Sequence, residues 1–101
     1  MSLLHIVNQS PFERSAFDTC LRLSKAGAGL LLIEDGVYAA QAEGRAADKL
    51  HGALEKMTVY ALAPDVAARG LGGKLHSDVT LVDYDGFVVL TTEYDRVQSW
   101  L

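Results

Sequence analysis

The sequence predicts one α/β domain over residues 1–101, with a mostly parallel sheet of four to five strands and helices on both faces of the sheet. Three observations lead to this fold class. Strand-like and helix-like segments alternate along the chain, an order typical of helices that connect parallel strands. The unbroken apolar run in the segment Gly29–Ile33 is typical of a strand buried on both faces. A length of 101 residues is that of one domain with a substantial core.

Local signals predict the first strand and the first helix. The apolar segment Leu3–Val7 predicts the strand. Ser10, Pro11 and Glu13 then supply an N-cap serine, a proline at the first helical position and a capping-box glutamate. We therefore expect a helix that begins at Pro11 and ends near Lys25.

Two helices and a strand follow in the middle of the chain, before a further short helix. The segment Glu34–Ala42 predicts a short helix or a turn, and Arg45–Lys56 predicts an amphipathic helix. Met57–Leu62 is rich in β-branched and aromatic residues, which favour a third strand. Pro64–Arg69 predicts a brief helix that ends at Gly70.

The C-terminal part contains a fourth strand and one ambiguous segment. Val79–Asp83 predicts the strand. The β-branched residues of Gly86–Thr92 favour a strand, whereas Asp85 is a good N-cap for a helix. We favour the helix, because strands and helices alternate up to that point.

The composition limits the classes of partner. The formal charge is −4, and the nine Lys and Arg residues do not cluster, which argues against direct binding of nucleic acid. Half of the residues are hydrophobic, and the mean hydropathy is +0.13. A small domain exposes much of its surface, so we expect another subunit to cover part of the apolar surface.

The sequence also predicts a location. The segment Met1–His5 lacks the basic and long apolar regions of a secretory signal, and no apolar stretch reaches the ~18 residues that span a bilayer. The single cysteine, Cys20, cannot form an internal disulfide, which fits a reducing compartment. We therefore expect a cytoplasmic protein that has no contact with a membrane.

Cys20 is the only candidate for a covalent nucleophile. It falls in the middle of the expected first helix, whereas the helix dipole acts mainly within the first turn. Its helical neighbours include Ala16, Phe17 and Leu23, and no cation lies one turn away. These neighbours favour a core thiol of ordinary or raised pKa. Two interpretations stay open: a structural thiol and a reactive one.

Glu34 and Asp35 lie at the carboxyl end of the second strand, the edge at which open α/β sheets bind ligands and partners. An acid–base pair is one interpretation, although consecutive residues that leave a strand point to different sides. In the other, Asp35 caps the following helix and Gly36 allows the tight exit from the strand.

No metal or cofactor motif is visible. His5, His51 and His76 are too scattered for a metal-ligand spacing. We expect His5, in the first strand, to be buried and hydrogen bonded, and His51 to be a solvated helix residue. We therefore expect neither a metal nor a cofactor.

Several motifs, taken in order, resemble the DsrH/TusB family. They are Leu4–Pro11, Leu30–Ala40, Val59–Leu62, Asp65, Ala68–Gly70, Val82–Val88 and Gln98–Trp100. Their order, their spacing and the total length make the resemblance specific, and it covers nearly the whole chain. The family belongs to the DsrE-like superfamily of Rossmann-like α/β domains. Cys20 in the first helix, Phe12-Glu13 and Thr91–Glu93 look closer to the DsrH type.

The resemblance implies assembly with DsrE/TusD-like and DsrF/TusC-like subunits into a heterohexamer, which relays sulfur as cysteine persulfide. It also implies docking of a DsrC/TusE-like or TusA-like sulfur carrier. The principal sulfur-carrying cysteine of such complexes belongs to the DsrE/TusD-type subunit. Two settings are open: 2-thiolation of the tRNA wobble uridine and cytoplasmic sulfur oxidation.

Two functions follow from this resemblance. In one, the chain is an interaction subunit that completes the hexamer and shapes the docking surface for a carrier. In the other, it is a sulfurtransferase component that holds persulfide on Cys20, the candidate catalytic residue. The exposure of the Cys20 sulfur atom distinguishes them, because a donor thiol must reach a persulfide site.

Overall fold

The computed structural model describes residues 2–12 and 15–100 and confirms the predicted fold class. Within these residues, five strands form one parallel sheet in the order β4-β3-β2-β1-β5. The strands are β1 Leu3–Val7, β2 Gly29–Leu32, β3 Thr58–Leu62, β4 Thr80–Val82 and β5 Arg96–Trp100. The central strand β2 is buried along its whole length, as its apolar run predicts.

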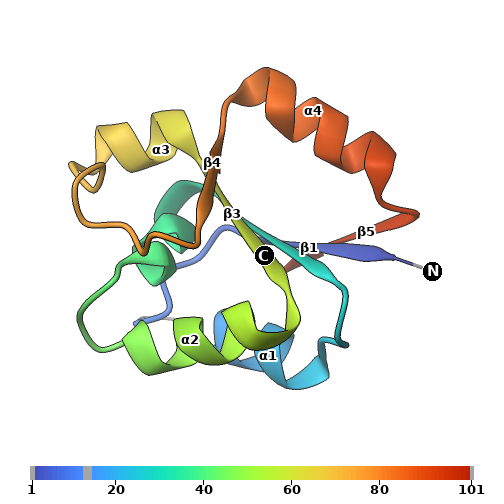
Figure 1. The fold of residues 1–101 in the computed structure, drawn as a ribbon, viewed down its shortest axis with the longest axis horizontal. Helices are drawn as coiled ribbons and strands as arrows, with labels where there is room; N and C mark the ends of the chain where they lie inside the picture. The colour runs from blue at the N-terminus through green and yellow to red at the C-terminus, as the bar shows by residue number, and fades with distance from the viewer. Residues whose placement is uncertain (1, 13–14, 101) are drawn as a thin grey trace.

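The helices divide unequally between the two faces of the sheet. They are α1 Ala16–Leu23, α2 Ala47–Lys56, α3 Ala63–Ala68 and α4 Tyr84–Glu93, with the 3-10 segment η1 Glu34–Ala40. The first three connections step from β1 toward the β4 edge, whereas the last returns across the sheet to β5. Right-handed crossovers therefore place α1 to α3 on one face and α4 on the other. Figure 1 shows α1 and α2 together on one side of the sheet and α4 on the opposite side.

Two hydrophobic cores correspond to the two faces. The larger core contains Phe17 of α1, Leu50 of α2 and Val66 of α3, all buried. The smaller core contains Leu90 of α4, which packs in a cluster with Leu31 of β2. Among the described helices, α4 alone contributes to this second core. Much of one sheet face therefore depends on a single helix for cover.

The helix α1 begins at Ala16, and not at Pro11 as the sequence predicts. The hydroxyl oxygen of Ser10 accepts the backbone N–H of Phe12 at 3.2 Å, so this serine closes a local turn instead of capping the helix. The predicted capping-box residue Glu13 lies outside the described residues. The sequence signal therefore predicts the start of α1 several residues too early.

The C-terminal segment forms the predicted helix and one strand that was not predicted. The N-cap of α4 is Asp83, and not Asp85: the Asp83 carboxylate accepts the backbone N–H of Gly86 at 2.7 Å, and Asp85 lies in the first turn. The strand β5 pairs with β1 at the edge of the sheet, and its residues are mostly exposed. The other elements differ from their predicted bounds by about one or two residues.

None of the helices in the described ranges has the length and apolar character that crossing a membrane requires.

Candidate functional site

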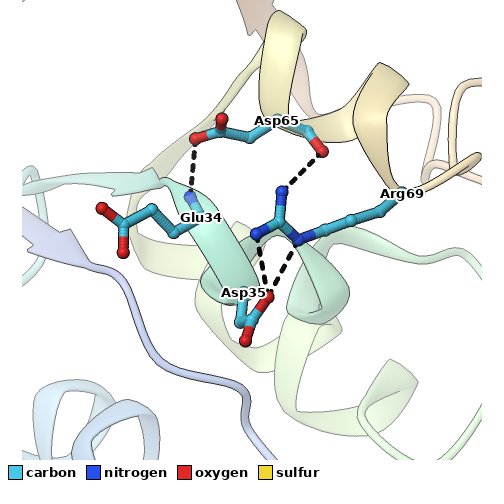
Figure 2. Close-up of polar contacts among 4 residues, drawn as sticks. All are labelled: Glu34, Asp35, Asp65 and Arg69. Carbon is cyan, nitrogen blue, oxygen red and sulfur yellow. Dashed lines mark hydrogen bonds and ion pairs between the residues drawn. The ribbon is translucent and has the colours of Figure 1, made fainter.

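An ion pair between Asp35 and Arg69 lies at the carboxyl end of the central strands (Figure 2). The Nε and Nη2 atoms of Arg69 both donate to Oδ1 of Asp35, each at 2.9 Å. The Nη1 atom donates to the backbone carbonyl of Asp65 at 3.1 Å. Asp35 follows β2 and Arg69 follows α3, which extends from β3, so these contacts join the ends of two adjacent strands.

A second contact holds the first residue of η1. The carboxylate of Asp65 accepts the backbone N–H of Glu34 at 2.7 Å. Glu34 has a φ of 49°, in the left-handed region that residues other than glycine rarely adopt. The Asp65 contact stabilises this strained backbone. The Glu34 side chain points away from Asp35 and Arg69 (Figure 2), so the two consecutive carboxylates do not converge.

Gly36 allows η1 to approach the end of β1. A Cβ atom at this position would clash with the backbone carbonyl oxygen of Val7. Gly36 therefore allows close packing against β1, whereas the unusual backbone conformation at the exit from β2 lies at Glu34. The capping role expected of Asp35 is wrong, because Ile33 is the N-cap of η1 and no side chain caps it. The Asp35 carboxylate binds Arg69 instead.

We call Glu34, Asp35, Asp65 and Arg69 the charged surface. The geometry of these four residues does not match an acid–base pair. Such a pair needs two titratable groups that face one reacting atom. Asp35 is engaged by Arg69, Asp65 accepts a backbone N–H, and Glu34 points elsewhere. The Asp35 side chain is nevertheless 58% exposed and that of Arg69 is 23% exposed. Both charges are therefore available to a docking protein.

Cys20 lies in the larger core, on the buried side of α1. Its exposed fraction is 0%, and its sulfur atom lies 3.8 Å from the hydroxyl oxygen of Ser24. Burial raises the pKa of the Cys20 thiol, while the Ser24 contact and the charge of Lys56 oppose this rise. The raised pKa agrees with the prediction from its apolar neighbours. Its role in sulfur transfer stays a prediction.

Lys56 is a cation near Cys20 that the sequence does not predict. It ends α2, and its ammonium group donates to the backbone carbonyls of Leu21 at 2.8 Å and Ser24 at 3.1 Å. A cation at the last carbonyls of a helix complements the helix dipole. No cation lies one helical turn away from Cys20 in the sequence, and Lys56 lies 35 residues beyond Leu21. No local signal connects the two segments.

The three histidines lie in two different surroundings. His5 is 3% exposed, and its Nδ1 atom accepts the indole N–H of Trp100 at 3.0 Å, which confirms the expected buried, hydrogen-bonded histidine. His51 is exposed, as expected, but its ring contacts that of His76 edge to face, with ring centres 5.2 Å apart. Among the residues that the structure describes, no three His, Cys, Asp or Glu side chains form a group able to hold a metal ion.

Comparison with known proteins identifies the family. Residues 9–97 match the model of the family described as DsrH like protein. The chain therefore belongs to the DsrH family.

Two relatives are both named TusB. TusB of Escherichia coli is 41% identical over 98 residues, which cover 97% of this chain and 100% of that protein. TusB of Salmonella enteritidis is 45% identical over 84 residues, which cover 83% of this chain and 86% of that protein. The expected membership of the DsrH/TusB family is thus confirmed, while the closer likeness to the DsrH type stays a prediction.

Two solved structures share the fold. The YchN protein from Escherichia coli superimposes with a TM-score of 0.73 at 17% identity, and the match covers 98% of each chain. The protein MTH1491 from Methanobacterium thermoautotrophicum superimposes with a TM-score of 0.70 at 14% identity, over 96% of each chain. At these identities the likeness shows the α/β fold alone.

Proposed function

We propose that this chain is a subunit of a sulfur relay complex and acts there mainly as an interaction subunit. Membership of the DsrH family supports the relay. The proposed partners are DsrE/TusD-like and DsrF/TusC-like subunits, with a DsrC/TusE-like or TusA-like carrier that docks on the assembly. The TusB relatives support tRNA wobble-uridine 2-thiolation in the cytoplasm as the setting, with cytoplasmic sulfur oxidation as the alternative.

One observation carries the interaction role: the outer side of α4 exposes three large apolar side chains. Tyr84 and Val88 are each 61% exposed, and Val89 is 51% exposed. The opposite side of the same helix packs Leu90 in the smaller core. A surface helix that exposes large apolar side chains opposite its buried side indicates a protein interface. We call Tyr84, Val88 and Val89 the α4 surface and propose that a partner subunit covers it.

The alternative function, a persulfide on Cys20, has support from its polar neighbours Ser24 and Lys56. In that reaction the Cys20 thiolate attacks the outer sulfur of a donor persulfide. A new S–S bond forms on Cys20, the S–S bond of the donor breaks, and the donor leaves as a thiolate. Complete burial and the raised pKa oppose this reaction. We therefore propose that Cys20 is secondary and that the principal persulfide lies on the DsrE/TusD-like partner, as the family resemblance implies.

Assembly with substituted chains tests the interaction role. Val88→Asp places a charge in the α4 surface, and Phe12→Asp is the matched control, because Phe12 is 41% exposed and packs beside Arg45, away from α4. In sedimentation experiments we expect the wild-type chain and the control to form a complex with both partner subunits, and Val88→Asp to lose it. A dilute, stable monomer whose sedimentation neither partner changes would contradict the proposed function. Unimpaired assembly of Val88→Asp would exclude the α4 surface as the interface.

A further inference from the structure

A hollow of about 340 Å³ lies at the amino end of the sheet, where β1 and β5 begin. This is the end at which the N label stands in Figure 1, opposite the strand ends that carry Asp35 and Arg69. The volume of the hollow is within the range of small-ligand sites. The lining includes Ser2, Leu3, His5, Leu23, Lys25 and Arg96.

The charge of this hollow differs from that of the whole chain. Lys25 and Arg96 are its charged lining residues within the described part of the chain, and both side chains are exposed. The nearby carboxylate of Asp95 accepts the backbone N–H of Ser2 at 2.9 Å and does not line the hollow. Two lining cations outnumber the nearby Asp95 carboxylate, which leaves a local excess of positive charge in a chain whose net charge is −4.

The walls of the hollow are largely apolar. Leu3 lies at the start of β1, and Ala26 and Ala28 lie between α1 and β2. Leu23, in the last turn of α1, is 58% exposed although it is a large apolar side chain. A ligand that fits these walls carries a short aliphatic group as well as a negative charge.

His5, which lines the hollow, has one ring nitrogen without a hydrogen-bond partner among the described residues. Its Nδ1 atom accepts the indole N–H of Trp100, so the neutral ring carries its proton on Nε2. The Nε2 atom is buried and has no hydrogen-bond partner among residues 2–12 and 15–100. Burial and the nearby charge of Lys56 lower the pKa of His5, which keeps the ring neutral and Nε2 a donor. A buried donor without an acceptor is costly, and a bound acceptor that reaches Nε2 would remove that cost.

We propose that this hollow binds a small aliphatic monocarboxylate. One carboxylate oxygen accepts the Nε2–H of His5, and the negative charge lies between Lys25 and Arg96. The aliphatic group contacts Leu3 and Leu23, which line the hollow. This site lies at the other end of the sheet from the charged surface and does not depend on the proposed sulfur relay.

Titration with butyrate, followed by NMR, tests this site on the full chain. Trp100 is the single tryptophan, so one indole N–H signal reports on the Trp100–His5 contact. We expect butyrate to shift this signal and the His5 ring nitrogens in a saturable way. Butan-1-ol and sodium chloride at equal ionic strength should leave both unchanged. An unchanged indole signal, or equal shifts with butanol or chloride, would overturn the proposal.

Substitution of the two exposed cations locates the site. The double variant Lys25→Met, Arg96→Met should weaken butyrate binding at least about tenfold, because it removes two charge-assisted contacts. Lys74→Met is the matched control, since Lys74 is an exposed lysine outside the hollow, and it should bind butyrate as the wild type does. Equal affinity of the double variant and the control would refute the assignment.

Discussion

Replacing Gly36 with alanine tests how closely η1 packs against β1. The added Cβ atom would clash with the carbonyl oxygen of Val7, which belongs to the backbone of a paired strand and cannot rotate away. Overpacking costs about 1–3 kcal/mol where side chains can adjust. Because this contact is with backbone, we expect Gly36→Ala to lower the free energy of unfolding by about 3 kcal/mol. For a domain of this size, that corresponds to a fall in Tm of roughly 12–24 °C.

Gly52→Ala is the matched control. Gly52 lies inside α2, and a Cβ atom there meets no other atom within 4 Å. Alanine in a helix interior is about 0.5–1 kcal/mol more favourable than glycine, so this variant should gain stability. The same chemical change thus has opposite predicted signs at Gly36 and Gly52.

Thermal and urea unfolding, followed by circular dichroism at one protein concentration, measure both effects. The predicted clash is refuted if the free energy of unfolding of Gly36→Ala lies within about 0.5 kcal/mol of the wild-type value while Gly52→Ala behaves as expected. That result would mean that the end of β1 and η1 can separate without cost.

Three other predictions follow. Asp35→Asn should lower the free energy of unfolding by less than about 1 kcal/mol, measured in urea, because its ion pair with Arg69 is partly exposed; sulfur transfer by the assembled complex should persist. Cys20 should react with iodoacetamide at neutral pH more slowly than a cysteine peptide, since burial raises its pKa, and mass spectrometry gives the rate; an equal rate would contradict the buried thiol. Burial lowers the pKa of His5 below its usual 6.5, so the unfolded chain binds a proton first as the pH falls below 6.5. Stability should therefore fall from pH 7 to pH 5, and an equal pH slope in His5→Gln would contradict this.

The elements that the sequence predicts well have strong local patterns. β1 and β2 are apolar runs, and α2 has an apolar stripe, so neighbouring residues alone identify them. β5 lacks such a pattern, because an edge strand with mostly exposed residues needs no apolar run. Its position depends on pairing with β1, far away in the sequence. The start of α1 was misplaced because Ser10 forms a turn with Phe12, which the same residue types allow.

The location of the charged surface was predictable, whereas its contacts were not. Glu34 and Asp35 follow a buried strand, and the carboxyl ends of parallel strands are where sites form. The partner of Asp35 is Arg69, 34 residues later, and the cation near Cys20 is Lys56, at the end of another helix. Such contacts arise only when α3 and α2 pack in the folded chain, so no spacing in the sequence reveals them.

Mass spectrometry of each subunit in the assembled complex tests the central claim most directly. The complex is exposed to a persulfide donor, and the mass of one added sulfur atom is sought on every subunit, with wild-type chain and with Cys20→Ser. Because Cys20 is fully buried, we predict that this chain carries little of the sulfur. The family resemblance implies that most of it is on the DsrE/TusD-like partner. Cys20→Ser should then leave the assembly intact and reduce sulfur loading without abolishing it. Stoichiometric sulfur on this chain, with transfer eliminated in Cys20→Ser, would contradict the account and make Cys20 a principal carrier.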